Sequence, residues 1–141
     1  MEKIDVAEVG TQISDAGFTL AVVGATGAVG REALSLLAAR DFPVGRLRLM
    51  ASARSAGQTL DFNGHAVEVE ALQNASFQGV DFALFSAGSA ASLEHAPRAA
   101  AQGARVIDNT SAVRMDPHIP LVVTEVNPHA MVGRYEDIGF H

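Results

Sequence analysis

Hydrophobic and polar positions along this chain form blocks whose spacing is typical of strands and helices in alternation. Continuous apolar runs at residues 18–23 and 80–88 end at or beside a glycine, the pattern of strands buried on both faces of a sheet. Each run precedes a stretch with apolar residues at helical spacing, at 28–40 and 90–102. The pattern therefore predicts parallel strands joined by helices, with Gly103 as the C-cap of the second helix.

The region between these two units predicts more strands. Polar and apolar residues alternate over 46–52, which predicts a strand. This strand completes a unit of strand, helix and strand, for which we expect a right-handed crossover. Residues 58–72 hold two β-type runs around Asn63 and Gly64, a pair that accepts positive φ, so they predict a hairpin. We expect the hairpin to elaborate the fold without forming a site. Further short strands are predicted at 104–112 and 120–127.

This succession predicts the fold class. Strands that alternate with helices from one end to the other indicate an α/β domain of the doubly wound, Rossmann type. We expect a mostly parallel sheet with helices on both faces, built from residues 18–130. Residues 1–17 form an N-terminal extension, as a short helix or an extended arm, and residues 131–141 form a C-terminal tail.

Composition and charge exclude several classes of partner. The 141 residues are 48% hydrophobic and 18% charged, enough for one domain with a core. The net charge is −6 and the ten Lys and Arg residues are scattered, which argues against nucleic-acid or anionic membrane surfaces. No apolar run reaches the roughly 18 residues of a membrane span, and the acidic N-terminus does not resemble a signal peptide. We expect a cytoplasmic protein.

The chain also offers few candidates for metal or thiol chemistry. It contains no cysteine, so it supplies neither disulfides nor a thiolate nucleophile. Its histidines lack the spacing of a zinc site, so we expect no metal and interpret them as surface or loop residues. They are His65, His95, His118, His129 and His141.

A glycine turn after the first strand is the strongest motif. It reads GATGAVG, with Gly24, Gly27 and Gly30 between a predicted strand and a predicted helix. The first glycine allows the sharp turn, the second lets backbone approach a pyrophosphate, and the third allows close packing of helix on strand. The free N–H groups and positive dipole end of the helix favour phosphate. The motif predicts a dinucleotide-binding domain.

The end of the second strand indicates which dinucleotide binds. NAD-selective domains place a carboxylate there, about 20 residues beyond the glycines, to bind the ribose 2′-OH. This chain has Ser52, Arg54 and Ser55 instead, a set of donors and one positive charge that suits the 2′-phosphate of NADP. The alternative is that Arg54 is a solvated loop arginine.

Two more loops follow strands at the edge where such sheets bind ligands. Residues 86–92 are small enough for a cofactor to lie close, although Ser86 and Ser89 could serve only to cap the following helix. The next loop is a candidate anion site, or else a turn closed by its own side chains with a surface arginine. Its polar residues are Asn109, Thr110, Ser111 and Arg114.

Five segments taken together resemble a known family. In order they are VVGATGAVG, ASARSAG, FALFSAG, VIDNTSAVRMDP and PLVVTEVN, within residues 18–127. Their succession is similar to the NADP-binding domain of aspartate-β-semialdehyde dehydrogenase. The resemblance implies an oxidoreductase function, the NADP-dependent reductive dephosphorylation of β-aspartyl phosphate in lysine, methionine and threonine biosynthesis. A relative of N-acetyl-γ-glutamyl-phosphate reductase is an alternative.

The resemblance also assigns roles to individual residues. It implies that Arg114 binds substrate phosphate or inorganic phosphate, and that Asn127 lies near the nicotinamide. It places NADP contacts at Thr26, Gly27, Ala28 and Val29, at Arg54 and Ser55, and along the loop of Ser86, Ala87 and Gly88.

The family's nucleophile is a cysteine, and its catalytic histidine and carboxylate-binding arginine belong to a second domain. Because this chain has no cysteine, we expect it to bind NADP without catalysing the reaction alone. The alternative is a stand-alone dinucleotide- or partner-binding module, a truncated or degenerate paralogue. In either case an exposed apolar face would favour self-association or a partner chain that supplies the missing domain.

Overall fold

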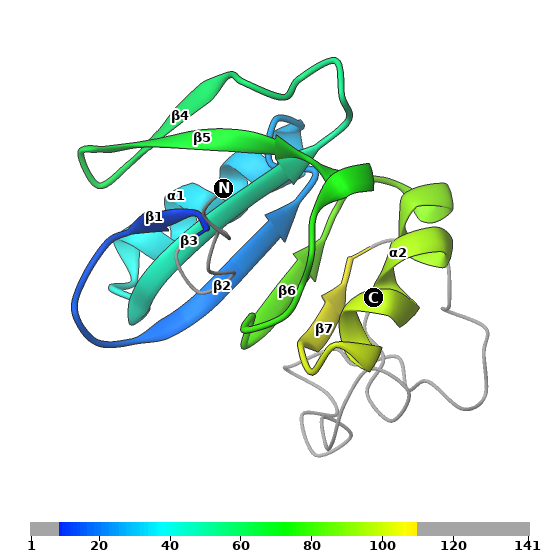
Figure 1. Cartoon of the computed structure of the whole chain (residues 1–141). Coiled ribbons are helices and arrows are strands. Elements are labelled where there is room, and N and C mark those ends of the chain that lie inside the picture. The colour runs from blue at the N-terminus through cyan, green and yellow to red at the C-terminus, as the bar shows by residue number, and fades with distance from the viewer. Residues whose placement is uncertain (1–8, 110–141) are drawn as a thin grey trace, which may run out of the picture.

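The computed structural model describes residues 9–109, which form a twisted sheet flanked by two helices (Figure 1). The predicted strand at 120–127 lies outside these residues. The strands are β1 (Thr11–Gln12), β2 (Phe18–Val23), β3 (Val44–Ala51), β4 (Thr59–Phe62), β5 (His65–Ala71), β6 (Phe82–Phe85) and β7 (Arg105–Asp108). The helices are α1 (Ala28–Ala39), α2 (Ser89–Ala101) and the 3-10 turn η2 (Leu72–Asn74).

The sheet topology confirms the predicted fold class. The strand order is β4, β5, β3, β2, β6, β7, and the five strands from β5 to β7 along this order run parallel. From β2 the chain moves outward through β3 to β5 and then returns to β6 on the other side of β2. The strand order therefore reverses beside β2, and this reversal is where doubly wound sheets bind their ligands.

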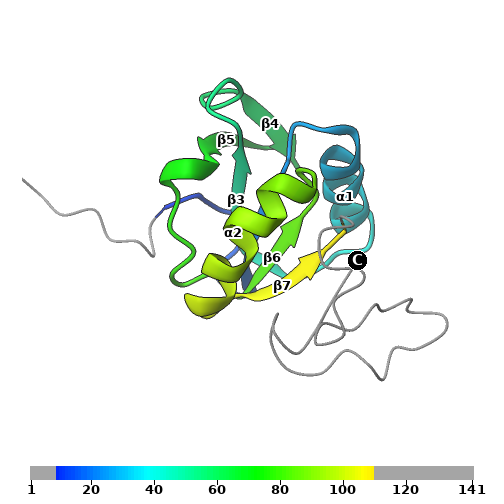
Figure 2. The same ribbon diagram turned by 90° about the vertical axis from the view of Figure 1, so that its right-hand side faces the viewer.

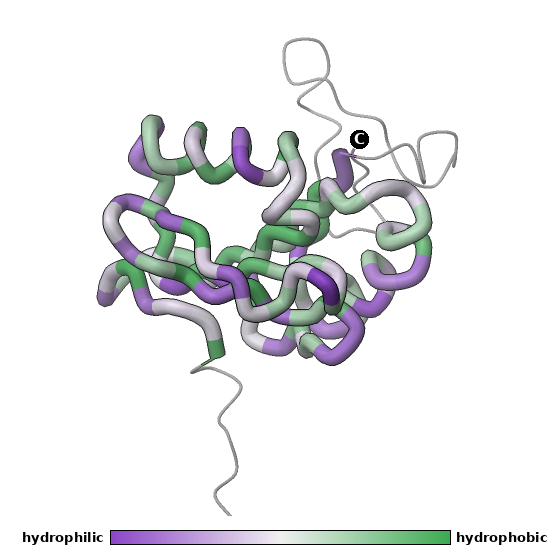
Figure 3. The backbone as a smooth tube through the Cα atoms, turned by 90° about the horizontal axis from the view of Figure 1, so that it is seen from above, coloured by the Kyte–Doolittle hydropathy of each residue, from purple (hydrophilic) through white to green (hydrophobic). Residues whose placement is uncertain are grey.

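Each face of the sheet carries its own core. In β2 the side chains of Leu20 and Val22 pack on the side of α1, whereas those of Ala21 and Val23 pack on the side of α2. Figure 2 shows the two helices on opposite sides of the sheet. In Figure 3 the hydrophobic colour is strongest along the strands in the middle. The continuous apolar run of β2 is thus explained by burial on both faces.

The hairpin is confirmed, but its predicted role is wrong. Strands β4 and β5 pair antiparallel through a turn in which Asn63 and Gly64 have φ of +50° and +84°. However, β5 also pairs in parallel with β3, with Leu49 opposite Val69. The second strand of the hairpin is therefore a full member of the main sheet, and its end reaches the edge where doubly wound sheets bind ligands.

The described part of the N-terminal extension, residues 9–17, is extended rather than helical. Strand β1 pairs antiparallel with β3, with Thr11 opposite Leu47. Strand β5 pairs with β3 only from Leu49 onward, so β1 occupies the remaining part of the same edge. The domain boundaries after residues 17 and 130 stay predictions.

Both helices end in the same hydrogen-bonding pattern. In α2 the N–H of Gly103 donates to the carbonyl of Ala100 at 3.0 Å, and the N–H of Ala104 donates to that of Ala99 at 3.1 Å. This is a Schellman motif, in which Gly103 has φ of +104° one residue beyond the C-cap, Gln102. In α1 the equivalent position is Asp41, with φ of +51°.

Asp41→Gly is expected to raise the free energy of unfolding by about 0.5 to 1 kcal/mol, because glycine adopts a left-handed φ without the steric cost of a Cβ. Gly103→Ala should lower it by a similar amount: a Cβ there meets nothing within 4 Å, so the cost is that of placing alanine at a φ of +104°. Urea denaturation of both variants measures the two changes in the free energy of unfolding. Equal stability of Asp41→Gly and the parent would contradict the prediction.

Candidate functional site

A cavity of about 800 Å³ opens at the carboxyl ends of β2, β3, β5 and β6. The glycine turn after β2 forms its floor, and the loops after β3 and β6 lie to either side. Because carboxyl ends of parallel strands meet at one edge, residues distant in sequence converge here. The lining residues are Gly24, Thr26, Gly27, Ala51, Ser52, Ala53, Arg54, Leu72, Gln73, Ser86, Ala87 and Ala91.

Two of the three glycines in the turn are required by the fold itself. Gly24 has φ of +89°, and a Cβ there would lie 2.8 Å from the backbone nitrogen of Ala87. A Cβ at Gly30 would lie 2.2 Å from the carbonyl oxygen of Gly24. The turn is therefore packed tightly between the loop after β6 and the first turn of α1.

Gly27 differs from the other two. Its φ is −79°, which any residue adopts, and a Cβ there would meet only the carbonyl oxygen of Gly24, at an ordinary 3.5 Å. Gly27 is the N-cap of α1, whose first turn has neither a side-chain cap nor an acidic residue. The residue is exposed and lines the cavity. This arrangement leaves the N-terminus of α1 open to an anionic ligand that approaches the backbone closely.

Hydrogen bonds from neighbouring side chains hold the two loops of the site. Arg31 donates from Nε to the carbonyl oxygen of Thr26 at 3.0 Å, and the Thr26 hydroxyl lies 3.5 Å from that of Ser55. The Ser86 hydroxyl donates to the carbonyl of Val23 at 2.9 Å. These contacts fix the loops before any ligand binds.

Arg54 is the one charged side chain among the described residues that line the cavity. It is exposed, and within residues 9–109 its guanidinium has no hydrogen bond or ion pair to a protein group. Its loop is folded back on itself, since the N–H of Ser55 donates to the carbonyl of Ser52 at 2.9 Å. The guanidinium is thus available to an anion at the side of the cavity next to β3.

Some residues predicted to bind cofactor or phosphate do not line the cavity. Asn109 is exposed beyond the end of β7, where its N–H donates to the carbonyl of Phe85 at 2.9 Å. The alternative interpretation of Ser89 as the helix cap is wrong, because α2 begins at Ser89 and Gly88 is its N-cap. Arg114 and Asn127 lie outside the described residues. Those described without lining the cavity are Ala28, Val29, Gly30, Ser55, Gly88 and Asn109.

Sequence reasoning missed other residues that line the cavity. Ala51 and Ala53 flank the predicted serine, and Ala91 lies in the first turn of α2. Leu72 and Gln73 follow β5, which was predicted only as half of a hairpin. The position of β5 next to β3 was the missing information.

The expectation about histidines is wrong for His95, which lies within α2 and is buried. Within the part of the chain that the structure describes, no group of three or more His, Asp or Glu side chains could hold a metal ion. The expectation that the protein binds no metal stays a prediction. Neither α1 nor α2 is long and apolar enough to cross a bilayer, a finding that covers residues 9–109.

Comparison with known proteins places this geometry in a family. The sequence model described as semialdehyde dehydrogenase, NAD binding domain, matches residues 19–133. The chain belongs to this family. The semialdehyde dehydrogenase match begins at β2 and covers every strand and helix that contributes to the cavity.

Individual semialdehyde dehydrogenases agree with this assignment. The chain is 56% identical over 113 residues to the aspartate-semialdehyde dehydrogenase of Aquifex aeolicus, covering 79% of this chain and 33% of that protein. A crystal structure of aspartate semialdehyde dehydrogenase II from Vibrio cholerae, complexed with ASA, matches with a TM-score of 0.80 and 51% identity. It covers 82% of this chain and 38% of the other. The chain thus spans about one third of the length of the curated relatives it matches.

Proposed function

We propose that this chain is the NADP-binding part of an aspartate-semialdehyde dehydrogenase. The observation that carries the proposal is the open backbone at Gly27, at the uncapped N-terminus of α1, inside a cavity of about 800 Å³. Family membership supports a nicotinamide dinucleotide as the ligand. The choice of NADP over NAD rests on Arg54, whose guanidinium faces no carboxylate within the described residues.

The residues that line the cavity support one orientation of this cofactor. The pyrophosphate would lie on the glycine turn at Gly27, where helix N–H groups and the helix dipole stabilise negative charge. The adenosine ribose with its 2′-phosphate would lie toward Ser52 and Arg54, after β3. The nicotinamide would extend past the loop of Ser86 and Ala87, after β6. When bound, the cofactor exchanges a hydride with the substrate, and the residues described here bind and orient it.

We further propose that these 141 residues alone do not oxidise aspartate semialdehyde. The family's reaction requires a thiolate that attacks the aldehyde, and the sequence contains no cysteine. The hydroxyl of Ser86, one of the serines at the cavity, donates to a backbone carbonyl rather than to a general base. NADPH formation from the semialdehyde and phosphate by the pure protein would refute this part of the proposal.

Calorimetric titration of the purified chain with NADP and, in parallel, with NAD tests the central proposal. We expect saturable binding of NADP and weaker binding of NAD, because only NADP carries the 2′-phosphate that Arg54 can bind. Stronger binding of NAD would refute the assignment to Arg54 while leaving the dinucleotide site intact. Binding of neither nucleotide would refute the function itself.

A second candidate, a module that binds a partner chain or itself, is favoured by the exposed apolar residues on the α1 side. Phe18 and Leu36 are 41% and 48% exposed, and the ring of Phe18 contacts those of Phe42 and Phe82. Such a surface favours association. Sedimentation at high concentration tests it, and a monomer throughout would count against self-association.

A further inference from the structure

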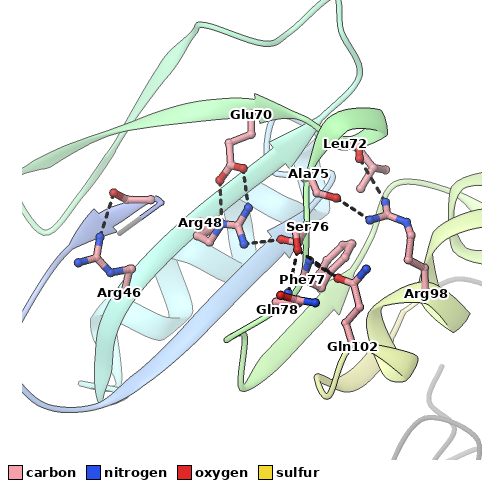
Figure 4. A network of polar contacts seen from close by, with 11 residues as sticks. Arg46, Arg48, Glu70, Leu72, Ala75, Ser76, Phe77, Gln78, Arg98 and Gln102 are labelled. Atoms are coloured by element: carbon pink, nitrogen blue, oxygen red, sulfur yellow. Dashed lines mark hydrogen bonds and ion pairs between the residues drawn. The ribbon is translucent and has the colours of Figure 1, made fainter. Parts of the chain in front are cut away.

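The segment Leu72–Phe77, which leads from β5 toward β6, forms one wall of the cavity through Leu72 and Gln73. Apart from the short turn η2 it has no regular secondary structure. Three side chains from elsewhere in the chain hold its backbone, as Figure 4 shows: Arg98 from α2, Gln102 at the C-cap of α2, and Arg48 from β3. The shape of this wall therefore depends on polar side chains rather than on sheet or helix hydrogen bonds.

Arg98 holds the part of the segment that faces the cavity. Its Nη1 donates to the carbonyl oxygen of Ala75 at 2.5 Å, and its Nη2 donates to that of Leu72 at 3.3 Å. The guanidinium also lies 5.0 Å from the centre of the Phe77 ring. One side chain thus bridges the first residue of η2 and its C-cap, and also stacks on the ring of Phe77.

The orientation of Arg98 is itself fixed. Its Nη2 lies 2.8 Å from Nδ1 of His95, one turn earlier on α2. Arginine only donates hydrogen bonds, so Nδ1 of His95 is the acceptor and its Nε2 carries the proton. That Nε2 lies 2.7 Å from the carboxylate of Glu94. The buried imidazole therefore connects Arg98 to a negative charge at the surface.

The other two side chains hold the far end of the segment. Gln102 accepts a hydrogen bond from the N–H of Phe77 at 2.5 Å. Arg48 donates to the carbonyl of Ser76 at 2.5 Å and forms a two-point ion pair with Glu70, with a shortest distance of 2.7 Å. Arg98 differs from both because it binds the carbonyl of a residue that lines the cavity.

We propose that Arg98 is a positioning residue for the adenosine end of the dinucleotide site. The inference rests on the proposed function. Strand β5 lies on the side of β3 away from β2, so Leu72 and Gln73 flank the same side of the cavity as Arg54. By holding η2 before the ligand arrives, Arg98 removes part of the ordering cost that binding would otherwise include.

Arg98→Met tests the inference, because methionine keeps an unbranched stem and removes every donor. The matched control is Arg105→Met, an exposed arginine at the amino end of β7, whereas the cavity opens at the carboxyl ends of the parallel strands. Calorimetry should show that the substitution lowers the affinity for NADP and for 2′,5′-ADP, its adenosine half, by the same factor, roughly fivefold. Hydrogen exchange of the amides of Leu72–Phe77 should become faster in the ligand-free variant. Arg105→Met should change neither readout.

The outcomes separate the two proposals. Failure of the parent chain to bind either ligand refutes the proposed function and the inference with it. If the parent binds and Arg98→Met binds equally well, only the inference is overturned. A larger loss for NADP than for 2′,5′-ADP would also overturn it, because it would show a general loosening of the site rather than an effect at the adenosine end. Unchanged hydrogen exchange of the Leu72–Phe77 amides in Arg98→Met would also overturn the inference.

Discussion

Arg54→Ala is expected to weaken NADP binding by about 10- to 100-fold and to leave NAD binding unchanged, since hydrogen bonds to charged groups contribute about 1.5 to 3 kcal/mol. The 2′-phosphate is the group that distinguishes the two dinucleotides, and Arg54 is the charged side chain that lines the proposed site. The described residues include no partner for its guanidinium, so the substitution breaks no contact within the folded protein that the structure records. Stability should therefore stay the same.

Arg105→Ala is the matched control, because it removes an exposed positive charge from the amino end of β7, an edge strand of the described sheet that lies beyond β2 and β6 from β3. It changes the net charge equally, so it reports any long-range electrostatic effect on an anionic ligand. Parallel titrations with NADP and NAD measure both variants. An equal loss of NADP and NAD affinity in Arg54→Ala would show that Arg54 contacts something common to both dinucleotides. No loss would make it the solvated loop arginine of the alternative interpretation.

Gly30→Ala is expected to lower the free energy of unfolding by about 3 kcal/mol, the upper end of the usual cost of overpacking. The added Cβ would lie 2.2 Å from the carbonyl oxygen of Gly24 and 2.8 Å from the Cα of Ala25. Both atoms belong to the backbone of the turn, so no flexible side chain can yield. Helix α1 would have to move away from β2, which disturbs the core formed by Leu34 and its neighbours.

Gly27→Ala, three residues earlier, provides the comparison. Its Cβ meets only one atom at ordinary contact distance, so stability should fall by about 1 kcal/mol or less, the cost of alanine at an N-cap. NADP affinity should nevertheless fall by at least about tenfold, because the methyl group would occupy the space where the pyrophosphate approaches the backbone. Urea denaturation and titration of both variants separate the two effects. A Gly27→Ala variant that binds NADP like the parent would mean that the dinucleotide does not cross the turn.

The features that the sequence predicted well depend on neighbouring residues. The strand at 18–23, the turn from Gly24 and the hairpin at Asn63 and Gly64 are all determined within a few positions of the chain. The apolar run ending in glycine reports burial on two faces directly, because each face demands its own apolar residues. Local patterns therefore sufficed for the fold class and for the floor of the site.

The walls of the site depend on contacts between distant residues. Leu72 reaches the cavity because β5 pairs with β3, a choice of partner that the hairpin pattern does not reveal. His95 is buried and its Nδ1 lies 2.8 Å from Nη2 of Arg98, whereas its own helix is rich in alanine and gives little indication of which face is covered. Polar side chains that bind backbone carbonyls leave no periodic signal, so these contacts emerge only from the structure.

Strand β1 has a consequence for the behaviour of the protein in solution. A long β-strand with one unpaired edge offers its free N–H and C=O groups to strands of other molecules and can template aggregation. On β3 this edge is shared between β5 and β1, and the pairing of Thr11 with Leu47 covers the portion that β5 does not reach. The two residues of β1 thus protect this part of β3 from pairing with strands of other molecules. A version of the protein that starts at Phe18 would lose this protection while keeping every residue of the cavity.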